Sequence, residues 1–182
     1  NFTKAIELDP TSAEAYTQRG LLNFEQGNHP EARQDLNKSL ELLPNPPKDL
    51  LVSILSASAP LELEGGDPDK AIARASRLIE LEPTLEIYLT RAKAYLQTGM
   101  LELAVDDLTE VSLLDEDNAE AYQLRGKAYF ELGDFSKAIE DLTEALKSDP
   151  ENVQLLLLRG DSYLELNQPG EAIKDFDTVL AL

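Results

Sequence analysis

The fold is decided by residues 119–150, which read AEAYQLRGKAYFELGDFSKAIEDLTEALKSDP. In the first half, apolar and small side chains recur at helical spacing, at Tyr122, Gly126, Tyr129 and Phe130, and the pattern ends at Gly133. In the second half the pattern resumes and runs until Pro150, at Ala138, Ile139, Leu142, Ala145 and Leu146. The stretch therefore predicts a helical hairpin, in which a first helix (A) is joined by a tight turn to a second helix (B).

This hairpin pattern recurs along the whole chain, and positions that recur once per period form columns. An alanine column has spacings of 39, 33, 34 and 34 residues, at Ala32, Ala71, Ala104, Ala138 and Ala172. A turn column precedes it by five residues, at Gly27, Gly66, Gly99, Gly133 and Asn167. Asn is the residue that best replaces Gly at positive φ, so all five positions suit a turn. Prolines mark the starts of B helices at Pro30, Pro68 and Pro169, and their ends at Pro10, Pro44, Pro83 and Pro150.

These columns resemble the tetratricopeptide repeat, whose pattern is met by Tyr122, Gly126, Tyr129, Gly133, Ala138, Leu142, Ala145 and Pro150. The resemblance implies an all-α fold, a right-handed superhelical solenoid of antiparallel helix hairpins. We expect a single solenoid over residues 1–182 that is a segment of a longer chain. Its parts are the tail of a preceding repeat at 1–10 and repeats at 11–44, 45–83, 84–117, 118–150 and 151–182.

The repeat at 45–83 is irregular. It carries five extra residues around 45–49, and Pro60 inside its A helix predicts a kink or an early helix end. Two interpretations remain open. The repeat is simply a tolerated irregular unit, or it opens a hydrophobic surface for a partner at Leu50, Leu51, Val52, Ile54 and Leu55.

Composition excludes several classes of function. The chain has 35 acidic and 16 basic residues, and its net charge of −19 repels nucleic acid. It has no Cys, and His29, interpreted as a solvated loop residue, is its only His, which removes thiolate and multi-His metal sites. We find no catalytic constellation and predict a non-enzyme without cofactor or metal. The longest uncharged stretch, 50–61, is too short to span a bilayer, so we expect a soluble protein and favour the cytoplasm over the periplasm.

One charged pairing recurs at a separation of 16 residues. Its basic members lie in A helices at Arg19, Arg91, Arg125 and Arg159, and its acidic members lie in B helices at Asp35, Asp107, Asp141 and Asp175. In the irregular repeat both are missing together, and Ser58 and Arg74 stand in their places. This joint loss predicts a structural ion pair between helices A and B that could reach the neighbouring repeat. The alternative is a row of arginines presented to an anionic ligand.

The family resemblance also implies a concave groove lined by one face of the A helices. The residues on that face are Thr17, Leu21, Phe24, Leu89, Lys93, Leu96, Gln123, Lys127, Phe130, Leu157, Asp161 and Leu164. Lys93 and Lys127 share a column and could receive a peptide carboxylate, or they are a solubilising pair balanced by nearby glutamates. Phe24 and Phe130 either pack within their hairpins or form a ligand platform.

The function implied by the resemblance is a protein–protein interaction module or scaffold that binds a peptide or a partner domain. Chaperone-binding members of this family clamp a C-terminal carboxylate with Lys and Asn at set columns of the A helices. Here the Asn columns are filled by other residues, so chaperone tail binding is not supported. These residues are Gln18, Ala57, Thr90, Leu124 and Leu158. One alternative is a self-assembling scaffold that forms a homo-oligomer through the apolar face of the last helix, Ala172, Ile173, Phe176, Val179 and Leu180. The other is the recognition domain of a larger enzyme.

Overall fold

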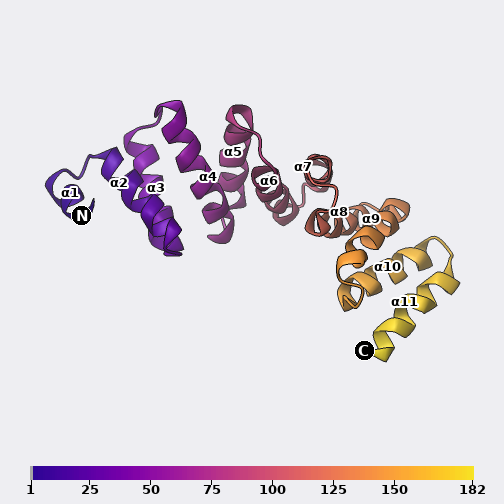
Figure 1. Cartoon of the computed structure of the whole chain (residues 1–182). Helices are drawn as coiled ribbons and strands as arrows, with labels where there is room; N and C mark the ends of the chain where they lie inside the picture. Colours follow the sequence, from indigo (N-terminus) through magenta and orange to yellow (C-terminus); the bar gives the residue numbers. More distant parts are fainter. Residues whose placement is uncertain (1) are drawn as a thin grey trace. The chain divides into compact units, whose positions relative to one another are not determined.

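The computed structural model describes residues 2–182, which form eleven helices and no strand (Figure 1). The helices are α1 (Phe2–Leu8), α2 (Ala13–Glu25), α3 (His29–Leu42), α4 (Lys48–Glu64), α5 (Pro68–Leu81), α6 (Leu85–Thr98), α7 (Leu101–Leu114), α8 (Ala119–Glu131), α9 (Phe135–Ser148), α10 (Val153–Glu165) and α11 (Pro169–Ala181). Even-numbered helices are the predicted A helices and odd-numbered ones the B helices. The all-α prediction is confirmed. Within residues 2–182, no helix combines the length and the apolar character needed to cross a bilayer.

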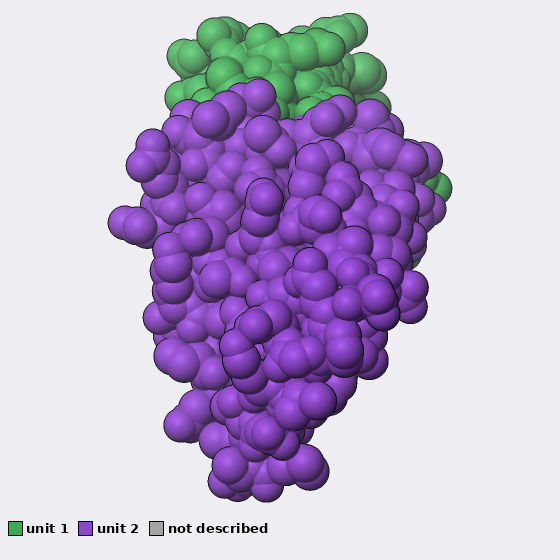
Figure 2. Space-filling view, turned by 90° about the vertical axis from the view of Figure 1, so that its right-hand side faces the viewer, with its two compact units in different colours: residues 1–94 green, residues 95–182 purple. Residues whose placement is uncertain are grey.

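The chain divides into two compact units, residues 1–94 and 95–182, which are coloured separately in Figure 2. Unit 1 contains the hairpins α2–α3 and α4–α5, and α1 packs against α2. Unit 2 contains the hairpins α8–α9 and α10–α11, and α7 packs against α8. The boundary falls inside α6, and each unit is described by itself below.

The turns between helices A and B have the backbone conformation that the turn column predicts. The φ angles of Gly27, Gly66, Gly99 and Gly133 are between 75° and 78°, and that of Asn167 is 58°. This left-handed region is strained for residues with a Cβ and least so for Asn. The proline columns are equally regular, since each B helix that precedes Pro10, Pro44, Pro83 or Pro150 ends two residues before it.

Each unit has its own core between helices A and B. In unit 2 a cluster formed by Ala138, Leu142, Leu155 and other buried residues joins α9 to α10. Close approach of helices A and B within one hairpin, such as α10 and α11, requires a small residue in the A helix. At Gly160 an added Cβ would lie 2.4 Å from the ring of Phe176 on α11, so a larger side chain does not fit there without movement.

The irregular repeat corrects two expectations. α4 continues through Pro60 to Glu64, so the predicted early end is wrong. Ala59 and Leu61, on either side of the proline, are buried in the core and hold the helix there. Leu51, Ile54 and Leu55 are also buried, so they are core residues and do not form the alternative hydrophobic partner surface.

Candidate functional site

Three of the four predicted Arg–Asp pairs are bidentate ion pairs in the structure. Arg125 donates from Nε and Nη2 to Asp141 Oδ2 and Oδ1, at 2.7 and 2.8 Å. The corresponding distances are 2.7 and 2.8 Å for Arg19 and Asp35, and 2.9 and 2.6 Å for Arg159 and Asp175. Two parallel N–H donors on one carboxylate fix both distance and orientation between helices A and B.

The guanidinium also reaches the B helix of the preceding repeat. Arg125 Nη1 donates to Ser112 Oγ at 2.8 Å and to Thr109 Oγ1 at 3.2 Å, both on α7. Arg159 Nη1 likewise donates to Thr143 Oγ1 on α9 at 3.0 Å. These hydroxyl partners were not predicted, although the column that holds Thr109 and Thr143 is visible in the sequence: Thr3, Asn37, Ser76, Thr109 and Thr143. Each arginine thus joins three helices.

The electrostatics of these pairs agree with a structural role. The hydrogen bonds to Asp141 raise the pKa of the Arg125 guanidinium, against an opposing effect of burial, and Asp175 acts in the same way on Arg159. Both arginine side chains are largely covered, so they are not presented to an anionic ligand in solvent.

The fourth pair, Arg91 with Asp107, remains a prediction. Arg91 belongs to unit 1 and Asp107 to unit 2, and each unit is described by itself. Within unit 1, Arg91 Nη1 donates to Ser76 Oγ on α5 at 3.0 Å, the same contact with the hydroxyl column that the other arginines make.

The irregular repeat contains an ion pair of reversed polarity. Here the acid, Glu62, lies on the A helix α4, and the base, Arg74, lies on the B helix α5, with Arg74 Nη1 3.0 Å from Glu62 Oε1. Arg74 Nη2 also donates to Asn37 Oδ1 on the preceding B helix, α3. Burial lowers the pKa of Arg74, and the Glu62 carboxylate partly offsets this effect. The three-helix contact is therefore retained with its charges exchanged.

The predicted A-helix face is accessible in unit 2. Leu157 and Leu164 on α10 are 41% and 48% exposed, and exposed Asp161 lies between them on the same helix face. The adjacent A helix, α8, packs against α10 and carries Gln123 and Lys127 in the matching columns, both partly exposed. Lys127 forms no ion pair with any residue of 2–182, so the balancing contact with Glu120 or Glu131 is absent at this lysine.

The two phenylalanines of the predicted face pack within their hairpins. Phe130 is half-buried against the α9–α10 core and meets Phe135 edge to face, with ring centroids 5.5 Å apart. Phe24 packs against the core that contains Leu36 and stacks on His29, with centroids 6.0 Å apart. Their packing role, left open by the sequence, is therefore the one that the structure describes.

The remaining predicted groove residues differ in accessibility. Thr17 is a correction, because its side chain is fully buried and cannot line a groove. Its hydroxyl donates to Ala13 O and shares a hydrogen bond with Ser39 on α3. Leu21, Leu89, Lys93 and Leu96 are half-buried, the first three in unit 1 and the last in unit 2.

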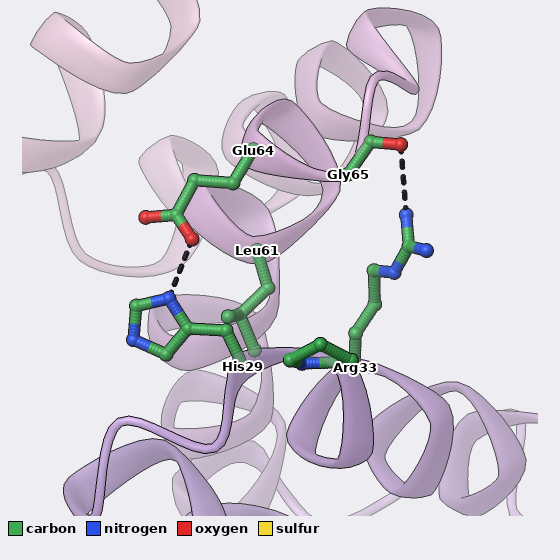
Figure 3. A pocket seen from close by; sticks show the side chains of 6 residues that line it. His29, Arg33, Leu61, Glu64 and Gly65 are labelled. Atoms are coloured by element: carbon green, nitrogen blue, oxygen red, sulfur yellow. Dashed lines mark hydrogen bonds and ion pairs between the residues drawn. The ribbon is translucent and has the colours of Figure 1, made fainter.

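His29 is a helix residue and not a loop residue, although its side chain remains partly exposed as expected. It is the first residue of α3, and its Nδ1 lies 2.5 Å from Glu64 Oε2 at the end of α4 (Figure 3). Arg33, one turn further along α3, donates from Nη1 to the carbonyl oxygen of Gly65 at 3.1 Å. The two contacts fasten α3 to the turn between α4 and α5. No cluster of three or more potential metal ligands occurs among residues 2–182.

Comparison with known protein families identifies the architecture. One model described as the tetratricopeptide repeat matches residues 57–121 and 124–182, and a second model of the same description matches residues 1–34. The chain belongs to the tetratricopeptide repeat family. The regular Arg–Asp pairs, the glycine turns and the A-helix face are thus parts of a tetratricopeptide repeat structure.

Solved structures with this tetratricopeptide fold include MamA and YrrB. One structure titled as the crystal structure of MamA protein is 24% identical, covers 93% of this chain and 90% of its own, and has a TM-score of 0.79. Another, titled MamA AMB-1, is 20% identical, with coverages of 96% and 93% and a TM-score of 0.83. YrrB, titled a TPR protein with an unusual peptide-binding site, is 17% identical, with coverages of 98% and 90% and a TM-score of 0.78. At these identities the likeness shows the fold alone. A search of curated proteins finds no match to the sequence.

Proposed function

We propose that this tetratricopeptide repeat protein is an interaction module that binds an extended segment of a partner protein along the A-helix face of unit 2. The observation that carries the proposal is the pair of exposed leucines, Leu157 and Leu164, which flank Asp161 on α10. YrrB supports the class of function, because its title describes a peptide-binding site on the same fold.

Apolar contact supplies the main driving force in this proposal. Burying a leucine side chain contributes about 1.5 to 3 kcal/mol relative to leaving it in water, and two leucines on one helix face offer this gain to one ligand. The face is seven residues long between them, so two apolar side chains of an extended or helical segment can engage both. Binding of this kind needs no catalytic group.

Charge selects the partner. The net charge of −19 attracts basic segments and makes their association rate depend on salt. Asp161 lies between the leucines as an acceptor for Lys or Arg, and Lys127 on α8 offers a separate donor to a carboxylate or carbonyl group. We therefore propose a segment with two apolar side chains and a basic residue between them.

Peptide display tests this function. A random peptide library is selected on the wild-type protein, and the recovered peptides are measured on Leu157→Ser/Leu164→Ser. The matched control is Leu103→Ser, because Leu103 is 46% exposed on the B helix α7 of the same unit. We expect the double variant to lose binding and the control to keep it, with weaker binding to Asp161→Lys and at high salt. Peptides that bind the double variant as well as the wild type would place the interaction elsewhere.

Self-assembly is a second candidate, supported by part of the last helix. Ile173 and Leu180 on α11 are exposed, and they lie seven residues apart. The predicted face is smaller than expected, however, because Ala172 is buried and Phe176 and Val179 are half-buried. Light scattering over a dilution series tests it, with Ile173→Ser/Leu180→Ser as the variant. A mass equal to that of the monomer at every concentration would eliminate this alternative.

A further inference from the structure

The contact between the first two repeats departs from the regular pattern in several columns at once. Glu62 occupies a column that holds tyrosine in the three later repeats, Tyr95, Tyr129 and Tyr163. Arg33 occupies a column that is otherwise aliphatic, at Ile72, Val105, Ile139 and Ile173. Apolar and aromatic groups are thus replaced by charged ones where α3 meets α4. These exchanges are concentrated at one place in unit 1.

A cavity of about 430 Å³ lies at this place. Its lining includes Arg33, Gln34, Asn37, Glu62, Asp67 and Lys70, which come from α3, α4, α5 and the turn before α5. Glu62 forms part of its wall although its side chain is only 1% exposed. The residues are contributed mainly by B helices, so the cavity is distinct from the A-helix face.

The ion pairs around the cavity leave one cation without a close carboxylate partner. Lys70 Nζ lies 2.7 Å from Asp67 Oδ2, and Arg74 neutralises Glu62 at 3.0 Å. Arg33 Nη1 is 4.0 Å from Glu62 Oε2, beyond hydrogen-bond distance, and within residues 2–182 its guanidinium donates only to the Gly65 carbonyl. A guanidinium has five N–H donors, so most of the donors of Arg33 remain available.

Amide donors lie beside this guanidinium. Asn37 accepts from Arg74 through Oδ1, which turns its NH₂ group away from that contact and leaves two donors unused. Gln34, exposed and one residue beyond Arg33, makes no side-chain hydrogen bond within the described chain. The cavity is therefore richer in unused donors than in unused acceptors.

One residue of the cavity wall, Glu62, carries an unpaired buried polar atom. Within residues 2–182, the buried side-chain atoms without a hydrogen-bond partner are Ser58 Oγ, Glu62 Oε1 and Arg74 Nη1. All three residues belong to α4 or α5 of the irregular repeat, and the last two atoms attract each other without a hydrogen bond. Proteins leave few such atoms unpaired, so each one needs an explanation, such as a bound water or ion.

We infer that this cavity binds a carboxylate group of a partner protein. Arg33 provides a bidentate partner for the carboxylate, and the Asn37 amide donates beside it. Gly65 positions Arg33, because a Cβ at this residue would lie 1.6 Å from Arg33 Nη1. Figure 3 shows this approach of Arg33 to Gly65. The inference does not depend on the A-helix face, so either proposal can fail alone.

Nuclear magnetic resonance tests the site with sodium acetate as the probe and sodium chloride at the same ionic strength as the reference. Two peptides distinguish the source of the carboxylate: acetyl-Ala-Glu-Ala-amide carries only a side-chain carboxylate, and acetyl-Ala-Ala-Ala carries only a C-terminal one. Acetyl-Ala-Gln-Ala-amide is the neutral control. We expect acetate and one of the two acidic peptides to shift the Arg33 Nε–H signal and the amides of residues 33–37 and 65–70, beyond any effect of chloride.

Variants show whether Arg33 is responsible. Arg33→Gln is expected to weaken acetate binding about tenfold or more, as for the loss of a charge-assisted contact, and Gly65→Ala to weaken it by displacing the guanidinium. Lys70→Gln, at an exposed side chain, is also expected to weaken acetate binding, but by less. Lys137→Gln is the matched control, because Lys137 pairs with Asp134 at 2.7 Å as Lys70 does with Asp67.

The result can overturn the inference in three ways. Acetate shifts no larger than those of chloride would exclude the site, and undiminished binding to a folded Arg33→Gln would exclude Arg33. Acetate binding without binding of either acidic peptide would overturn the assignment to a protein carboxylate. Unchanged amide signals from the rest of unit 1, away from residues 33–37 and 65–70, verify that each unit 1 variant is folded.

Discussion

Replacing Asp141 by Ala tests the claim that the Arg–Asp pairs hold the repeats together. The substitution removes both acceptors of the bidentate contact and leaves the Arg125 guanidinium in place. That side chain is only 13% exposed, so water does not fully replace the lost carboxylate. The remaining contacts are the hydroxyls of Ser112 and Thr109, which are neutral acceptors. We expect a large loss of stability and no effect on binding at the A-helix face.

The magnitude follows from burial. Removing one partner of a buried ion pair costs about 3 to 5 kcal/mol, because the other charge stays uncompensated. Asp35→Ala should cost less than Asp141→Ala, since its partner Arg19 is 28% exposed and retains more water. The double variant Arg125→Met/Asp141→Leu should recover much of the loss, because apolar replacement of both partners removes the stranded charge.

The assay is urea unfolding followed by far-UV circular dichroism, combined with hydrogen exchange. Repeat proteins unfold through nearest-neighbour contacts, so exchange is needed to locate the loss. Protection should fall first in α8 and α9, which the pair joins, and in α7, which supplies the hydroxyls. An unfolding midpoint equal to that of the wild type would refute the reasoning. So would a greater loss from Asp35→Ala than from Asp141→Ala.

Four further substitutions test local features by the same unfolding measurement. Gly133→Ala should cost about 1 to 2 kcal/mol because its φ is 78°, whereas Asn167→Gly should be nearly neutral at a φ of 58°. Gly160→Ala should cost about 1 to 3 kcal/mol, because its Cβ would meet the Phe176 ring at 2.4 Å. Asp134→Ala should cost about 0.5 to 2 kcal/mol at neutral pH through loss of the α9 N-cap. The Lys137 side-chain hydrogen bond lowers the pKa of Asp134. The cost should therefore shrink as the pH falls from about 4, where the carboxyl of the unfolded chain becomes protonated, through the lower pKa of the folded chain.

Local backbone chemistry explains why the turns were predictable. A column of Gly that admits Asn once indicates positive φ, since these residues share little else, and the structure has that conformation at Gly133 and Asn167. The fold class could be predicted from the same columns, because the period and the helical spacing recur in every repeat. Neither inference required knowledge of contacts between distant residues.

Contacts of individual polar side chains were harder to predict. Thr17 lies on the A-helix face by its spacing, yet its hydroxyl is buried against Ser39. A threonine is small enough to turn inward and bond its own helix, and helical position alone does not distinguish the two orientations. Leu157 and Leu164 are exposed as expected, whereas Phe24 and Phe130 on the same predicted face pack against their cores.

The reversed pair was not predicted because its spacing differs from that of the regular pairs. Glu62 lies one turn after Ser58, so the acid is not in the column that the arginines occupy. Its signal was nevertheless present, as Glu62 replaces a tyrosine and Asn37 replaces a hydroxyl residue. Each exchange is ordinary alone, and only their coincidence at one interface indicates a compensated change.

That coincidence indicates that each contact between neighbouring repeats is made by three helices. In the regular contact, helix A supplies the guanidinium, helix B the carboxylate and the preceding B helix a hydroxyl. In the irregular contact all three contributions change together, to Glu62, Arg74 and Asn37. A hairpin that carried its own ion pair could vary independently of its predecessor. Because the preceding helix changes as well, substitution of any one member should destabilise two neighbouring repeats, which is why hydrogen exchange in α7 is decisive for Asp141→Ala.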